Sequence, residues 1–289
     1  MMRFERAIAW LSLAFALASS FPSRVEAASA CVWKVTDPNG GTLYLGGSVH
    51  ALRPTDYPLP AAYNRAFDAS SRLVFENDPK ASSQEFSYVL KAGRYAKGDS
   101  LKNHVDPRTY DYLRRFFALR NVPEEKFRVF RPWLIDIILA APPPQYYLLG
   151  VERFLLRRAL ANSKPVSGLE SPKEHYQAFV GLSDREGEAL LLVLFINAGR
   201  ASSGGVSIVD AWRRGDVDLI WQKGRQEFRD FPAMTERLSG QRNRNWIPKI
   251  ESYLHSGQTY FVVVGAAHMG GPEGLLALLK ARDYEIEQL

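Results

Sequence analysis

Four short segments of the chain end in residues that could bind a metal ion or transfer a proton. Two of them share a Gly-x-x-His pattern, Gly47-Ser48-Val49-His50 and Gly265-Ala266-Ala267-His268, although the chain has only 5 histidines. The other two end in Glu76 and Glu170. Two neutral imidazoles and a carboxylate suit a divalent transition metal, and an open coordination position makes such a site catalytic. The segments therefore predict a catalytic metal centre, with Zn, Mn, Co and Fe all as candidates.

Each of these residues can be given a role in metal-assisted hydrolysis. We interpret His50, His268 and Glu76 as candidate metal ligands. A bound metal lowers the pKa of its water from about 15.7 toward about 7 and polarises a substrate carbonyl. Glu170 is then the candidate general base that passes the water proton to the leaving group. Because a sequence does not measure distances, Glu76 and Glu170 could exchange these catalytic roles.

Three further residues are candidate substrate contacts, and a structural interpretation stays open for all of the set. Ser48 precedes the first histidine, and Arg242-Asn243 opens an expected helix, where Arg242 could orient a carboxylate or an amide. A solvated helix face is the commoner place for such an arginine. In the same way, a histidine at a strand end is often a hydrogen-bonded core residue, and Glu170 could support the N-terminus of the next helix.

Other catalytic chemistries lack their signatures in this chain. The sequence contains no Gly-x-Ser-x-Gly elbow, no Walker-type Gly-Lys-Ser/Thr and no His-Glu-x-x-His. The single Cys, Cys31, excludes an intramolecular disulfide and a cysteine-rich zinc module. Lys and Arg number 37 against 31 Asp and Glu, a net charge of +6, and they are scattered along the chain. We therefore expect no nucleic-acid partner.

The elements that must position these residues are strands near both ends of the chain, with helices between them. Asn39-Gly40 lies between two β-prone runs and predicts a hairpin. Apolar runs predict further strands, and near-helical spacing predicts most of the remaining elements. Expected strands are 32–36, 42–45, 73–75, 164–169, 260–264 and 284–288. Expected helices are 61–69, 127–140, 151–161, 171–182, 184–198, 207–214, 217–228, 243–254 and 271–281. This order predicts an α/β fold, a mixed sheet with an inserted helical subdomain.

The ends of the strands decide whether the four segments can meet. Ligands of α/β sheets bind outside the carboxyl ends of strands. If the strands that lead to His50, Glu76, Glu170 and His268 share one sheet and one direction, their side chains converge. We expect Gly47 and Gly265 to allow a sharp exit from each strand, so that one turn geometry presents both histidines.

The first thirty residues predict export. Arg3 and Arg6 precede the apolar stretch Ala7–Ala18, and Ala28 and Ala30 offer cleavage sites of the Ala-x-Ala type. This stretch is shorter than a membrane-spanning helix needs. We expect a signal peptide over 1–30, one mature domain over 31–289, no integral membrane segment after cleavage, and a periplasmic or secreted protein. The alternative is a lipid anchor on Cys31.

The ordered motifs resemble the TraB/GumN family over nearly the whole mature chain. They are Tyr44–Leu52, Leu73–Glu76, Gly168–Glu170, Ala211–Asp216, Arg242-Asn243 before Trp246, and Val263–Leu276. The paired Gly-x-x-His motifs and the glutamate are similar to those of the Tiki metalloproteases, and more distantly to erythromycin esterase-like (EreA) and ChaN-like proteins. The resemblance implies pseudo-symmetric halves and a metal-dependent hydrolase site in which His50, Glu76 and His268 take part. Ser48 stands where the family usually has Thr, and Glu152 where Asp is usual.

These observations favour one function and leave two alternatives. The leading hypothesis is an exported, divalent-metal-dependent hydrolase, most plausibly a metallopeptidase, with a peptide or another small substrate. The first alternative is a non-catalytic periplasmic protein that binds a metal, haem or a peptide. The second is an exported interaction protein whose strand ends are purely structural. The sequence makes no prediction of the oligomeric state.

Overall fold

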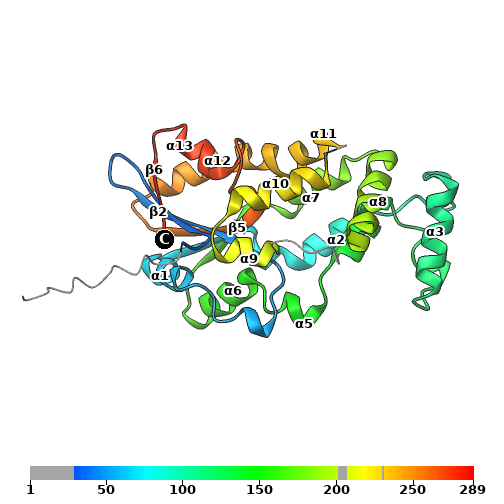
Figure 1. Cartoon of the computed structure of the whole chain (residues 1–289), viewed down its shortest axis with the longest axis horizontal. Coiled ribbons are helices and arrows are strands. Elements are labelled where there is room, and N and C mark those ends of the chain that lie inside the picture. Colours follow the sequence, from blue (N-terminus) through cyan, green and yellow to red (C-terminus); the bar gives the residue numbers. More distant parts are fainter. Residues whose placement is uncertain (1–28, 201–206, 230) are drawn as a thin grey trace, which may run out of the picture.

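The computed structural model describes residues 29–200, 207–229 and 231–289. A six-stranded mixed sheet runs through the body of the molecule in the order β4-β3-β5-β2-β1-β6. Helices cover both of its faces, with α1 and α6 on one side and α12 and α13 on the other (Figure 1). The strands are β1 (Val32–Thr36), β2 (Thr42–Ser48), β3 (Arg72–Asn77), β4 (Val166–Glu170), β5 (Tyr260–Gly265) and β6 (Glu285–Gln288). The predicted α/β fold with a mixed sheet is therefore confirmed, while the pseudo-symmetric halves stay a prediction.

The predicted hairpin forms at the start of the described chain. Strands β1 and β2 pair antiparallel, with Val32 opposite Gly46 and Thr36 opposite Thr42. In the turn, the amide of Gly40 donates to the carbonyl of Asp37 over 2.8 Å. Gly40 has a φ of 97°, which glycine adopts without the steric cost that a side chain would add. The Asn-Gly signal thus marks the hairpin turn correctly.

Four strands are parallel and end at the same edge of the sheet. β2 pairs with β5, β5 with β3, and β3 with β4, all in parallel register. Ser48 lies opposite Gly265, and Asn77 lies opposite Glu170. These are the strands that lead to the four candidate segments, so the convergence expected from the sequence is confirmed at the level of the sheet.

The helices follow the predicted pattern with some shifted ends. α1 and α6 have the predicted bounds, whereas α4 and α13 begin several residues later than expected. α4 begins at Pro132 because proline lacks a backbone N–H and is favoured in the first helical turn. α13 begins at Leu275 because Gly271 takes a φ of 77° before it. The helices are α1 (Ala61–Ala69), α2 (Ser82–Ala92), α3 (Pro107–Ala118), α4 (Pro132–Ala140), α5 (Pro144–Tyr147), α6 (Val151–Ala161), α7 (Pro172–Val180), α8 (Asp184–Arg200), α9 (Ile208–Arg213), α10 (Val217–Glu227), α11 (Pro232–Thr235), α12 (Gln241–Leu254) and α13.

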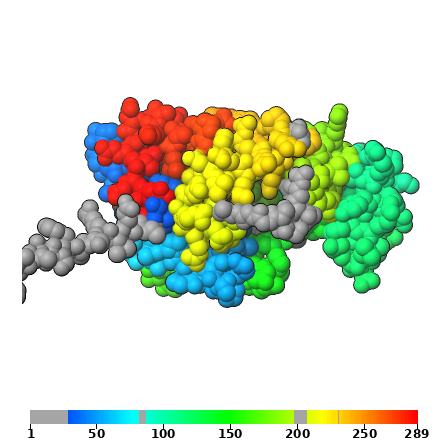
Figure 2. All heavy atoms as spheres, viewed as in Figure 1, coloured from blue at the N-terminus to red at the C-terminus, as the bar shows by residue number. Residues whose placement is uncertain are grey.

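One end of the molecule is helical and has hydrophobic clusters of its own. The main core lies between the sheet and its covering helices. A second cluster joins residues around α3 to Ile135 of α4 and Leu191 of α8, and a third is built around Trp133 and Leu134. This helical end projects beyond the sheet, with α3 farthest out (Figures 1 and 2). It corresponds to the helical part that the sequence placed between the strands.

The expected signal peptide lies almost wholly outside the described residues. Cys31 is fully buried at the start of the sheet. Burial raises the pKa of its thiol, since the thiolate would lose its hydration. Within the described ranges, no helix combines the length and the apolar character needed to cross a membrane.

Candidate functional site

The carboxyl edge of the four parallel strands gathers the candidate residues in the order of the sheet. Glu170 is the last residue of β4, and Glu76 lies one residue before the end of β3. His268 closes a short 3-10 turn, Ala266–His268, that follows β5 directly. His50 comes two residues after β2. The expected β3 ended at Phe75, but the strand continues to Asn77, so Glu76 projects from the sheet itself.

Arg242, in the first turn of α12, joins the two glutamates. Its Nη2 donates to Glu76 Oε2 over 2.6 Å and also to Glu170 Oε1, while its Nε lies 3.3 Å from Glu170 Oε2. The contact with Glu170 is therefore a two-pronged arginine–carboxylate pair. Only 12% of the Arg242 side chain is exposed. The expectation of a solvated helix face is wrong for this arginine.

The charge of Arg242 determines the ionisation of both glutamates. Burial by itself would raise the pKa of Glu76, but Arg242, followed by His268 and His175, outweighs it and lowers that pKa. The pKa of Glu170 is also lowered, because hydrogen bonds from His175 and Arg242 outweigh its burial. Both side chains are therefore carboxylates at neutral pH.

His268 is held as a neutral imidazole that points one nitrogen at this cluster. Its Nδ1 lies 2.7 Å from Asn243 Oδ1, and the Asn243 amide donates to the carbonyls of His268 and Glu273. The hydrogen-bond pattern therefore assigns the proton to Nδ1. The lone pair on Nε2 faces Arg242 Nη1 at 3.3 Å and Glu76 Oε1 at 3.9 Å. Burial lowers the pKa of His268 to about 4, which keeps the ring neutral.

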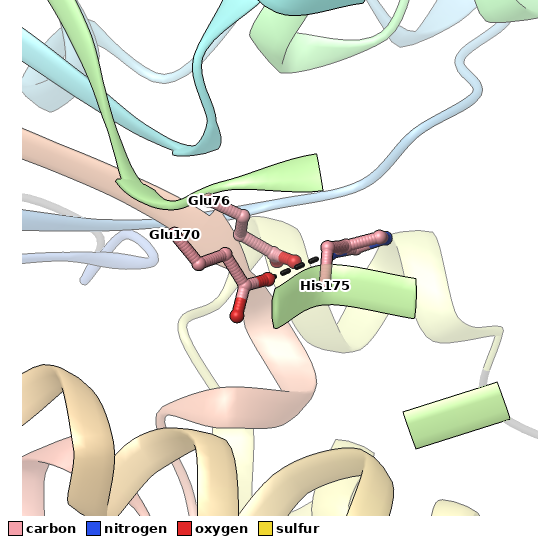
Figure 3. Close-up of side chains that lie close together, drawn as sticks. All are labelled: Glu76, Glu170 and His175. Atoms are coloured by element: carbon pink, nitrogen blue, oxygen red, sulfur yellow. Dashed lines mark hydrogen bonds and ion pairs between the residues drawn. The ribbon is translucent and has the colours of Figure 1, made fainter. Parts of the chain in front are cut away.

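His175 completes the cluster and was not identified from the sequence. Its Nδ1 lies 2.7 Å from Glu170 Oε1 and 3.0 Å from Arg242 Nη2. One ligand atom each from His175, Glu76 and Glu170 lies within 4.8 Å of the others, and the side chains point toward one another (Figure 3). In the sequence, the feature that could have identified His175 is the start of the helix that contains it. There Ser171 and Glu174 form a capping box right after Glu170. That cap turns the first helical turn back over the end of β4.

His50 lies on the same cleft but has a different partner. With Glu76 and His175 it lines a cleft of about 550 Å³. Its Nδ1 lies 2.7 Å from Glu152 Oε1, and 65% of its side chain is exposed. The negative charge of Glu152 raises the pKa of His50 to about 9, so the ring is protonated at neutral pH. A metal that used His50 would first have to displace this proton.

The two Gly-x-x-His segments differ in geometry. Gly265–His268 forms a 3-10 turn, whereas the chain leaves β2 at Ser48 without one. The expectation of one shared turn geometry is therefore wrong. A Cβ at Gly265 would lie 3.3 Å from Glu76 Oε1, which accepts the Gly265 amide proton, so a side chain there would require only a small shift of Glu76. Its φ of −51° is open to any residue.

The three expected substrate contacts take supporting positions. Ser48 is buried and donates its hydroxyl to Glu152 Oε1 over 2.6 Å. Asn243 is buried and fixes His268, and Arg242 joins the glutamates. A direct contact with substrate stays a prediction for all three, as do the ligand and catalytic roles of His50, His268, Glu76 and Glu170. Glu152, noted in the sequence only as a family departure, holds both Ser48 and His50.

The donor set of the cluster fits a divalent cation. Two carboxylates and the imidazole of His175 are close enough to share one ion, and His268 offers a neutral nitrogen beside Glu76. Glu76 and Glu170 carry one negative charge more than Arg242 balances. Arg242 already donates to the same oxygens, so a metal and the guanidinium would compete for them.

The family model described as TraB/PrgY/gumN family matches residues 31–288. No curated protein matches the chain.

Proposed function

The chain belongs to the TraB/PrgY/gumN family, and from this premise and the geometry of its site we propose a divalent-metal-dependent hydrolase that acts on peptide bonds. The observation that carries the proposal is the meeting of Glu76, Glu170 and His175, with His268 beside them, at the carboxyl edge of four parallel strands. Such an edge is where α/β folds bind their substrates. The cleft beside it is large enough for several atoms of a peptide.

The residues of the cluster would divide the work of hydrolysis. His175 and one or both of Glu76 and Glu170 would hold the ion, with His268 as a further ligand next to Glu76. The ion, when bound, supplies an activated water and a Lewis acid for the carbonyl. Whichever of the two glutamates is not needed as a ligand would accept the proton of the water and donate it to the leaving amine. Arg242 would hold that carboxylate ionised and in place.

The observation on Arg242 also favours a second function. Its guanidinium already pairs with both carboxylates, so a positive charge faces them without a metal ion. The second candidate is therefore a non-catalytic protein that uses the cleft to bind a metal, haem or a peptide. Both proposals include export to the periplasm or secretion, which rests on the signal peptide expected over residues 1–30.

Metal binding is the first test, measured as Mn²⁺, Co²⁺ and Zn²⁺ stoichiometry and affinity by calorimetry and elemental analysis. Glu76→Gln and His268→Ala should each weaken binding at least tenfold, because each removes a donor from the cluster. His255→Ala is the matched control, since His255 pairs with Asp37 away from the cluster. Unchanged affinity in both site variants would refute the metal centre.

Peptide cleavage is the second test, which separates the two functions. A library of fluorogenic peptides should be cleaved by the metal-loaded protein, and cleavage should stop in Glu76→Gln. If the protein binds a metal or a peptide tightly while no peptide is cleaved with any of the three metals, the binding function replaces the hydrolase.

A further inference from the structure

The cleft beside the cluster continues into an apolar compartment. From Glu76 and His175 it extends to α4 and α7, where its walls include Phe75, Ile137 and Phe179. Helix α4 contributes Asp136, Ile137 and Ala140 to the lining of the cleft. A substrate held near the cluster would therefore place a neighbouring group against apolar side chains.

Asp136 is a buried acidic residue among the apolar side chains that line this part of the cleft. It is 7% exposed and lines the cleft. Among the residues that the structure describes, none donates a side-chain hydrogen bond to it or forms an ion pair with it. Burial raises its pKa to about 7, with no neighbouring charge as a contributing cause. A buried carboxyl group without a partner is costly to the folded state. Its folding role therefore gives no reason for an acid here.

The charges that share the cleft also favour a cation. Four carboxyl groups line it, those of Glu76, Asp78, Asp136 and Glu152, and the cations Arg153 and protonated His50 lie among the lining residues. Glu76 is paired with Arg242. Glu152 is paired with His50, and Arg153 donates to Tyr147. The carboxyl group of Asp136 is the one at the apolar end with no cation of its own.

We propose that Asp136 is a specificity-determining residue that pairs with a positive charge on an aliphatic stem, such as the side chain of a lysine or arginine in a peptide. The apolar walls would cover the methylene groups, and Asp136 would receive the charged end. This inference rests on the proposed function for its view of the cleft as a substrate site. It adds the class of side chain that the substrate presents there.

Binding of two matched probes to the full chain tests the proposal without any need for catalysis. Nα-acetyl-lysine methylamide should bind at least tenfold more tightly than Nα-acetyl-norleucine methylamide, which has nearly the same shape and no charge. Asp136→Asn should reduce the preference to less than twofold. Asp78→Asn removes another carboxylate from the lining of the same cleft and should keep the tenfold preference.

Two further measurements make the result independent of folding defects and of the hydrolase proposal. In the unmodified protein, the lysine probe should shift the carboxyl ¹³C resonance of Asp136, and the norleucine probe should not. Glu76→Gln should keep the lysine preference even though it cannot cleave a peptide. Equal binding of the two probes, no binding of either, or a preference that survives Asp136→Asn would overturn the role of Asp136, whatever the outcome of the metal and cleavage tests.

Discussion

At the scale of single residues, two histidines of the site are held in opposite charge states by their partners. His268 is buried against Asn243 and is neutral, while His50 is exposed, paired with Glu152 and protonated. A neutral imidazole can ligate a metal at once, and a protonated one cannot. His268 is therefore better prepared than His50 for the ligand role that the sequence assigned to both.

We expect Glu152→Gln to lower the pKa of His50 from about 9 toward the ordinary value of about 6.5 in the metal-free protein. Because the pKa is raised in the folded state, the stabilisation from the pair is fully present below about pH 6.5 and is lost as the pH rises through about 9. NMR titration of the His50 ring measures the change. Glu273→Gln, which removes a partner of Arg244, is the control and should leave His50 unchanged. A titration near 9 in Glu152→Gln would contradict the ion pair.

At the scale of secondary-structure elements, small residues allow strands and turns to approach closely enough to form the site. A Cβ added at Gly46 on β2 would lie 2.7 Å from the ring of Phe261, and one added at Gly47 would lie 2.3 Å from Cys31 Sγ, both closer than a Cβ can approach. The carbonyl of Gly47 accepts hydrogen bonds from Tyr63 and Trp212, both fully buried. These contacts fix the end of β2 from which Ser48 and His50 project.

We expect Gly47→Ala to lower the free energy of unfolding by about 1–3 kcal/mol, since the added methyl group overlaps Cys31 Sγ. Cys31→Ala in the same chain should recover part of the loss, because it removes the sulfur atom. Equilibrium urea unfolding gives both values. Gly224→Ala in α10 is the control, since its Cβ would meet nothing within 4 Å and the change should be neutral or stabilising. Equal effects of the two glycine substitutions would refute the steric explanation.

At the scale of the whole molecule, the first and last described segments are joined. The amide of Ala30 donates to the carbonyl of Leu289, the amide of Leu289 donates to the carbonyl of Val32, and Gln288 donates to the carbonyl of Ala30. Strand β6 thereby extends the sheet next to β1. Ala30 and Cys31, which flank the second of the expected cleavage sites, are buried next to this pairing.

Under the proposed export, this arrangement leads us to expect cleavage after Ala28, which leaves Ser29 as the first residue. Cleavage after Ala30 would place a charged amine on Cys31, which is fully buried, at a high desolvation cost. Mass spectrometry of the exported protein determines the new N-terminus. The same spectrum tests the lipid anchor, because a lipid on Cys31 would require this buried residue to leave the sheet. A mass that includes a diacylglycerol group would contradict the buried position of Cys31.

Local patterns in the sequence were enough to predict the hairpin, the bounds of α1 and α6, and the four strands that lead to the candidate residues. Turn chemistry and apolar periodicity act over a few residues, so they can be read without the fold. From the sequence, Glu76, Glu170 and His268 meet at one edge only on the condition that their strands pair in parallel. The strands do pair in parallel. Strand ends were less predictable, as the extension of β3 to Asn77 shows.

The sequence by itself determined which residue types stand at the ends of the strands and that the chain carries the TraB/PrgY/gumN pattern. Only the tertiary structure decided that Arg242 forms ion pairs with the two glutamates, that His175 contacts Glu170 beside them, and that Glu152 pairs with His50. Each of these contacts except that between Glu170 and His175 joins residues more than sixty positions apart in the chain. Their distances depend on the order of the strands and on how α6, α7 and α12 pack at the edge of the sheet, which no local pattern encodes.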